Sequence, residues 1–118
     1  MNLWMRVAGL SGASAVGLGA VGAHILPKQG RSPEIVEVFN TGARYHLLHS
    51  VILAASAMAL PAGRKRTVVC ALFTSGITLF SGSCYAVAAA NQRKPYSSPA
   101  PVGGFALIGG WIALAALP

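Results

Sequence analysis

The chain has 118 residues, of which 54% are hydrophobic and only 9% are charged. Soluble domains carry about 25% charged residues, so this composition indicates an integral membrane protein. The formal net charge of +7 does not indicate nucleic-acid binding, because the basic residues punctuate apolar runs and form no long stripe with interleaved aromatic residues.

Four apolar runs are long enough to cross a bilayer, which takes about 20 residues in a helix. They cover residues 3–26, 43–60, 67–90 and 101–117. The segments that connect them are short, and no soluble domain interrupts the pattern. The sequence therefore predicts one all-α membrane domain over residues 1–118, an up-down bundle of four transmembrane helices.

The first run carries small residues at four-residue spacing, at Gly9, Ala13 and Gly17. This spacing lets helix backbones approach closely in lipid, so we expect the first helix to pack tightly. Its position near the N-terminus and Arg6 also fit a signal peptide, but the apolar run is long for one. We expect a retained helix.

A helix start precedes the second run, where Ser32, Pro33 and Glu34 match the preferences of the cap and first turn. Charged and polar residues then recur at helical spacing as far as Arg44, with apolar residues between them. The stretch 33–44 is therefore predicted to be amphipathic. Three placements fit this pattern: the stretch lies in the membrane interface before the second helix, it extends that helix beyond the bilayer, or it presents a solvated face.

Two histidines, His46 and His49, stand three residues apart inside the second apolar run. Ionisable groups are costly in hydrocarbon and usually face the interior of a bundle. An up-down topology also brings the other polar side chains to the end of the bundle opposite the termini. The predicted polar cluster consists of His24, Glu37, Arg44, Tyr45, His46, His49, Ser81, Ser83 and Tyr85.

Three chemical roles were weighed for this cluster. His24, His46 and His49 together would suit zinc, and His24 with His49 would suit haem from two helices. The histidines with Glu37 and Arg44 would suit a proton relay. The favoured interpretation is structural: the histidines hydrogen-bond Ser81, Ser83, Tyr85 or backbone carbonyls and fix the register of the helices.

No catalytic chemistry is expected. The chain contains no Asp, and neither Glu lies beside a Ser-His pair in the sequence. Cys70 and Cys84 fall in one predicted helix about 21 Å apart, so they cannot bridge each other and are expected to be buried thiols. We expect no metal and no cofactor.

Four motifs occur in order along the chain: GAHILP at 22–27, FxxxxxYHxxH at 39–49, GxxLFSGSxY at 76–85 and PVGGxxxxxGWxxLA at 101–115. In this order they resemble the transmembrane protein 256 family, also called domain of unknown function 423. The resemblance covers nearly the whole chain. It implies a small four-helix inner-membrane protein of bacteria or mitochondria and no known reaction.

The expected function is that of a structural or accessory subunit that packs against a larger inner-membrane complex, by analogy with respiratory-chain subunits. A small transporter or channel acting as an oligomer is the alternative. Lys28, Arg31, Arg93 and Lys94 are expected to contact a partner or anionic lipids such as cardiolipin. At the other end, Trp4, Trp111 and residues 64–66 are expected to anchor the bundle. The mitochondrial inner membrane is favoured, with a bacterial inner membrane as the alternative.

Overall fold

The protein is described by a computed structural model that covers residues 2–118. Its helices are α1 (Leu3–Ala20), η1 (Val21–Ile25), η2 (Leu26–Gln29), α2 (Pro33–Ala59), α3 (Arg64–Gly76), η3 (Ile77–Ser81), α4 (Gly82–Ala90) and α5 (Ala100–Ala116). The elements η1 and η3 are single π-helical turns, and η2 is a 3₁₀ turn, so these pieces join into four rods. Within the described residues there is no strand, which confirms the all-α prediction.

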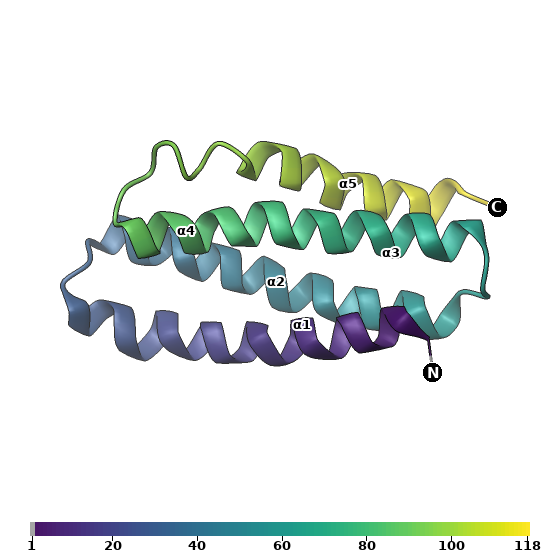
Figure 1. Cartoon of the computed structure of the whole chain (residues 1–118), viewed down its shortest axis with the longest axis horizontal. Coiled ribbons are helices and arrows are strands. Elements are labelled where there is room, and N and C mark those ends of the chain that lie inside the picture. Colours follow the sequence, from purple (N-terminus) through teal and green to yellow (C-terminus); the bar gives the residue numbers. More distant parts are fainter. Residues whose placement is uncertain (1) are drawn as a thin grey trace.

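The four rods lie side by side in a bundle 48 Å long (Figure 1). Both ends of the chain and the connection between α2 and α3 lie at one end of the bundle. The connections from η2 to α2 and from α4 to α5 lie at the opposite end, which we call the two-loop end. Neighbouring rods therefore run up and down, as the short connecting segments require.

Helix α2 begins at Ser32, whose Oγ accepts a hydrogen bond from the Ile35 amide at 3.3 Å. From there it runs without a break to Ala59. The stretch 33–44 is therefore the first part of α2, so of the alternatives open from the sequence the helix is extended and a separate interfacial segment does not form. The reason is that Ile35 and Phe39 continue the buried side of the helix and pack with Val87 in one apolar cluster.

Two apolar clusters hold the rods together. At the termini end, Leu53, Val69 and Phe73 are fully buried in the larger cluster. At the two-loop end, a smaller cluster is built around Leu26, Ile35, Phe39, Val87 and Ala88. The polar histidine core described below lies between these two clusters along α2.

Helix α1 packs on α2 through a face that includes the buried Ala8 and Ala15. The small residues singled out in the sequence face elsewhere. A Cβ added at Gly9 or Gly17 would meet no described atom within 4 Å, and Ala13 is exposed. This stripe therefore lies on the outer surface of the bundle, and other small residues of α1, Ala8 and Ala15, make the close contact with α2.

Helix α5 packs on α3 and η3 through close backbone approach. A Cβ at Gly103 would collide with the backbone amide nitrogen of Phe80 and lie 2.8 Å from the carbonyl carbon of Leu79. About two turns further on, a Cβ at Gly110 would lie 2.6 Å from the ring of Phe73. Only glycine fits these two positions without movement of α5.

Among residues 2–118, two continuous rods are long and apolar enough to cross a membrane: Leu3–Gln29 and Arg64–Ala90, each of 27 residues. The helix Ala100–Ala116 is apolar but shorter. The remaining rod, α2, carries Glu34, Glu37 and Arg44 in its first part.

Candidate functional site

The side chain of His46 joins three rods near the middle of the bundle. It is 6% exposed, and its Nδ1 lies 2.8 Å from the hydroxyl of Tyr85 on α4. Its Nε2 lies 3.1 Å from Ser11 Oγ and 3.5 Å from Ser14 Oγ, both on α1. His46 therefore links α2 to α1 on one side and to α4 on the other.

His49, one turn further along α2, joins a different neighbour. It is 3% exposed, and its Nε2 accepts a hydrogen bond from the indole N–H of Trp111 on α5 at 3.1 Å. Its Nδ1 lies 2.8 Å from the carbonyl oxygen of Tyr45. An indole N–H only donates and a carbonyl oxygen only accepts, so this arrangement requires a neutral ring with its proton on Nδ1.

Aromatic rings surround His49. Its ring lies 5.7 Å from the Phe73 ring and 6.0 Å from the Trp111 ring, between ring centroids, and the Phe73 and Trp111 rings meet edge to face at 5.5 Å. Edge-to-face pairs of this kind add about 0.5–1.5 kcal/mol beyond the burial of area. Trp111, which the sequence predicts as an anchor at the membrane interface, also makes a contact between α5 and α2 and remains 42% exposed, so the anchoring role stays a prediction.

The serines predicted as histidine partners bond to backbone carbonyls. Ser81 Oγ donates to the Gly42 carbonyl oxygen at 2.7 Å, which ties η3 to α2, and Ser83 Oγ donates to the Leu79 carbonyl oxygen within its own rod. Of the predicted side-chain partners, only Tyr85 reaches a histidine. Ser11 and Trp111 are histidine partners that were not predicted, although a serine and a tryptophan in apolar runs are signals of buried polar contacts.

His24 lies apart from the two core histidines, exposed on the turn η1. Within residues 2–118, no three His, Cys, Asp or Glu side chains come together in a way that would hold a metal ion. The three-histidine arrangement considered for zinc is therefore not formed, because His24 is on the outer face of its rod. His24 is exposed and His49 is buried, so the two histidines do not form the pair considered for haem.

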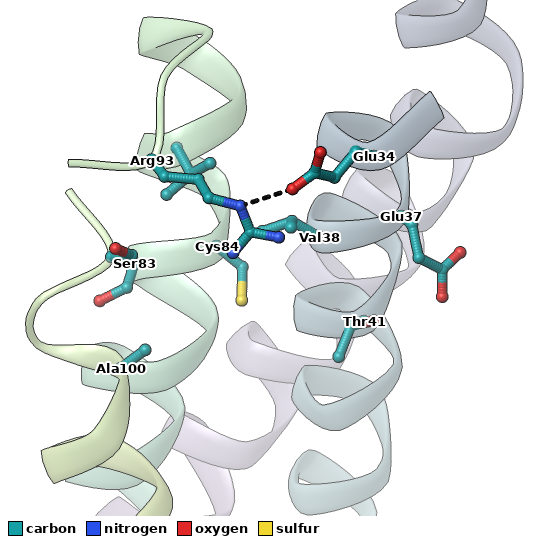
Figure 2. Close-up of a pocket in the computed structure, with 10 residues that line it drawn as sticks. Glu34, Glu37, Val38, Thr41, Ser83, Cys84, Arg93 and Ala100 are labelled. Atoms are coloured by element: carbon teal, nitrogen blue, oxygen red, sulfur yellow. Dashed lines mark hydrogen bonds and ion pairs between the residues drawn. The ribbon is translucent and has the colours of Figure 1, made fainter. Parts of the chain in front are cut away.

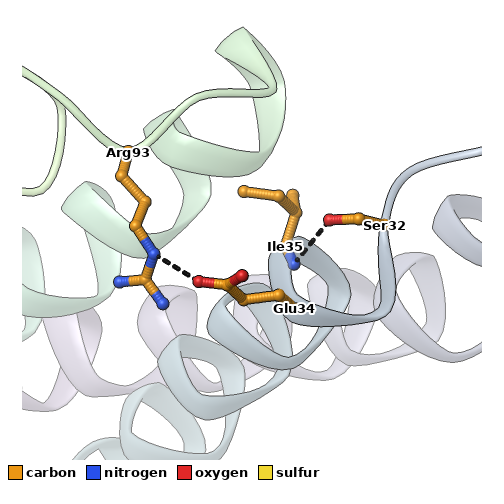
Figure 3. A network of polar contacts seen from close by, with 4 residues as sticks. All are labelled: Ser32, Glu34, Ile35 and Arg93. Carbon is orange, nitrogen blue, oxygen red and sulfur yellow. Dashed lines mark hydrogen bonds and ion pairs between the residues drawn. The ribbon is translucent and has the colours of Figure 1, made fainter.

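At the two-loop end, charged side chains pair with each other. Arg93 Nε donates to Glu34 Oε1 at 2.9 Å, beside the cap formed by Ser32 (Figure 3). Glu37 and Arg44, both on α2, lie 3.6 Å apart with exposed side chains. These two carboxylates therefore already have cationic neighbours.

The four basic residues predicted to form a recognition surface divide into two kinds. Arg31 Nε donates to the Ala88 carbonyl oxygen at 2.8 Å, which closes the end of α4, and Arg93 pairs with Glu34. Lys28 and Lys94 are exposed. Half of this set therefore takes part in contacts between rods.

A hollow of about 400 Å³ lies beside the Arg93–Glu34 pair, between α2, α4 and the start of α5 (Figure 2). Its lining combines both carboxylates, the guanidinium of Arg93 and the thiol of Cys84 with small apolar and hydroxyl side chains. A second hollow of about 430 Å³ lies between α1 and α3–η3, where His46, Tyr85 and Ser14 contribute to its lining. In both hollows, polar groups line open space beside the rods.

Comparison with known proteins identifies related sequences. Residues 18–104 match the family model described as protein of unknown function DUF423. A UPF0382 membrane protein of Schizosaccharomyces pombe is 32% identical and covers 94% of this chain and 96% of its own. The UPF0382 membrane protein YwdK of Bacillus subtilis is 34% identical over 95% and 92% of the two chains. The UPF0382 inner membrane protein YgdD of Escherichia coli is 33% identical over 88% and 79%. No solved structure matches the chain.

Proposed function

The chain belongs to the DUF423 family, whose relatives in bacteria and yeast are named membrane proteins, and from this premise we propose that it is a non-enzymatic four-span subunit. In this proposal all four rods cross the membrane. The bundle packs against a larger complex in an energy-transducing inner membrane, the mitochondrial one in eukaryotes. Two of the rods, Leu3–Gln29 and Arg64–Ala90, are long and apolar enough to span a membrane. The proposal adds that α2 and α5, which pack with them, also span it.

The lengths of α2 and α5 are compatible with this topology. Helix α5 has 17 residues, which is the lower limit of about 17–25 for a spanning helix. Helix α2 has 27 residues and measures about 40 Å, longer than the 30 Å hydrocarbon core. Its charged first part, Glu34 to Arg44, then reaches the headgroups, while His46 and His49 remain shielded by the neighbouring rods.

The observation that carries the non-enzymatic role is the use of the core histidines. All four of their ring nitrogens lie within hydrogen-bond distance of protein groups on α1, α2, α4 and α5. A catalytic histidine needs a nitrogen that reaches substrate. Three of these nitrogens instead connect α2 to other helices, which is the role of polar side chains that fix register in membrane bundles, and the fourth bonds within α2.

The outer face of α1 supports the packing role. Gly9, Ala13 and Gly17 lie exposed in one stripe, next to the exposed side chains of Leu10 and Val16. A stripe of small residues lets another helix approach closely in lipid. This face is left over after α1 has packed on α2, so it is available to a partner.

The test is purification in a mild detergent followed by native electrophoresis. We expect the wild-type protein to co-migrate with a larger complex, and we expect Ala13→Leu to weaken that association. Ala55→Leu, at an exposed position of α2, adds the same side chain elsewhere and is the matched control. Migration of the wild-type protein as a free monomer, or equal loss in both variants, would contradict the proposal.

A transport role is the second candidate, because of the hollow beside His46. That hollow combines hydroxyl groups of Ser11, Ser14 and Thr78 with the His46–Tyr85 pair. In liposomes, a transporter would give ion or proton flux that His46→Gln reduces. Absence of flux from wild-type protein at high protein density would leave the structural role as the sole proposal.

A further inference from the structure

Two hollows lie in succession between α2 and α5. The upper one, at the two-loop end, is the 400 Å³ hollow beside Arg93, and it is lined from α2 by Glu34, Glu37, Val38 and Thr41 and from α5 by Ala100. The lower one has about 450 Å³ and is lined by Tyr45, Leu48, His49, Phe80, Gly104, Leu107, Ile108 and Trp111. Neither α2 nor α5 fills this space, because α5 packs on α3 and η3.

The two hollows follow one another along the same faces of α2 and α5, and we call them together the groove. Along α2 the lining residues fall at positions 34, 37, 38, 41, 45, 48 and 49, and along α5 at positions 100, 104, 107, 108 and 111. Steps of three and four residues keep side chains on one face of a helix. Each helix therefore presents a single continuous stripe, and the upper hollow leads into the lower one.

The length of the groove matches one leaflet of a bilayer. The fifteen residue steps from Glu34 to His49 span about 22 Å along α2. Half of a bilayer, with its headgroups, measures about 20–22 Å. With Glu34 at headgroup level, the groove reaches close to the middle of the membrane at Trp111.

The charges of the groove are concentrated at its upper end. The chain has only two acidic residues, Glu34 and Glu37, and both line the upper hollow of a protein whose net charge is +7. Arg93 Nε donates a hydrogen bond to Glu34, and the terminal nitrogens of Arg93 extend over the hollow near Cys84 (Figure 2). Glu37 lies 3.6 Å from Arg44, longer than a normal hydrogen bond. The mouth thus offers a carboxylate and a guanidinium side by side.

We propose that this groove binds one zwitterionic phospholipid with a primary amine, of the phosphatidylethanolamine class. Its ammonium group contacts Glu37, its phosphate contacts the terminal nitrogens of Arg93, and one acyl chain follows the lower hollow to Trp111. This inference rests on the proposed membrane-spanning bundle and names a ligand for its surface.

The headgroup chemistry selects among lipids. A primary ammonium donates charge-assisted hydrogen bonds to a carboxylate, which are about twice as strong as neutral ones. A choline headgroup has no N–H to donate. An anionic headgroup without an amine places its charge next to Glu34 and Glu37 and leaves both carboxylates without a new partner.

The test is native mass spectrometry of the full-length protein taken from nanodiscs. The nanodiscs contain phosphatidylethanolamine, phosphatidylglycerol and phosphatidylcholine in equal amounts with identical acyl chains. We expect one retained phosphatidylethanolamine per chain. Glu37→Gln should lower its retention about tenfold, the loss of one hydrogen bond to a charged group. Equal retention of the three lipids, or no effect of Glu37→Gln, would overturn the proposal.

The acyl part of the groove has its own pair of variants. Ile108→Trp fills the lower hollow and should abolish retention, whereas Ile112→Trp, at an exposed α5 position outside the hollow, should not. The lipid proposal would be overturned if the wild type were a dimer that retained no lipid and Ile108→Trp were a monomer. In that case the groove would bind a second copy of the chain.

Cys84 supplies a readout that does not depend on mass spectrometry. Its thiol lines the upper hollow, while Cys70 is fully buried in the apolar core and serves as the internal reference. Phosphatidylethanolamine should slow maleimide labelling of Cys84, and soluble phosphoethanolamine should not. Equal protection by the soluble headgroup would reject a membrane lipid as the source. Both assays use purified protein, so they can fail while the labelling test of the four-span topology succeeds.

Discussion

Gly103 and Gly104 offer a direct test of the packing between α5 and η3. A Cβ at Gly103 would lie 2.8 Å from the Leu79 carbonyl carbon and collide with the Phe80 amide nitrogen, whereas a Cβ at Gly104 would lie 3.9 Å from the Phe80 ring. The atoms that Gly103 faces belong to the backbone, so they cannot rotate away. Gly103→Ala should therefore destabilise the bundle, and Gly104→Ala should not.

The expected magnitude follows from this geometry. To reach an ordinary contact of 3.4 Å from 2.8 Å, α5 must withdraw by at least 0.6 Å. A gap of about 0.5–1 Å forfeits a quarter to a half of the dispersion energy of each contact, and overpacking costs about 1–3 kcal/mol. Both variants gain the same helix propensity of about 1 kcal/mol, so their difference isolates the cost of the collision.

The assay is reversible unfolding in mixed micelles, followed by circular dichroism while the fraction of denaturing detergent rises. We expect the free energies of unfolding of the two variants to differ by about 1–3 kcal/mol, with Gly103→Ala the less stable. Equal stabilities would mean that α5 does not approach η3 through Gly103, and the position of α5 would be wrong.

Two further predictions concern contacts between rods. A double-mutant cycle of His49→Ala and Trp111→Phe should give a coupling energy of about 0.6 kcal/mol, with about 1.7 kcal/mol as the upper limit in membranes. Nitrogen NMR should show the His49 proton on Nδ1. Additive effects of the two substitutions, or a proton on Nε2, would contradict the hydrogen bond. Arg31→Met should lower the unfolding free energy by about 1 kcal/mol because it removes the side-chain donor to the Ala88 carbonyl oxygen and leaves it only the Asn91 amide. Lys28→Met, at an exposed position, should have little effect, and equal losses in both variants would contradict a specific role for Arg31.

Local signals in the sequence predicted the helices well. Ser32 and Pro33 mark the start of α2, and the residue before Pro61 is extended, as the restriction before proline requires. The apolar span of the second helix begins at 43, whereas the helix itself begins at Pro33, where the cap signal predicts it. Charge limits the hydrocarbon-buried part of a helix, whereas the backbone hydrogen bonds of α2 continue through Glu34 and Glu37.

Contacts between rods were predicted less well, since they depend on how each helix is rotated. The His46–Tyr85 hydrogen bond follows from two polar residues at matching depths in an up-down bundle. The His49–Trp111 bond requires the rotation of α5, which Gly103 and Gly110 set and which no periodicity of an almost uniformly apolar helix reveals. For the same reason, the spacing of small residues from Gly9 to Gly17 does not reveal that this stripe lies on the outer side of α1.

The most direct test of the central claim is the membrane topology of the four rods. Single cysteines at exposed positions 29, 62, 98 and 118, in a chain with Cys70 and Cys84 replaced by Ser, are labelled in sealed vesicles with a membrane-impermeant maleimide. A four-span bundle predicts that positions 62 and 118 react from one side of the membrane and positions 29 and 98 from the other. Labelling of 62 from the same side as 29, or of 98 from the same side as 118, would contradict it.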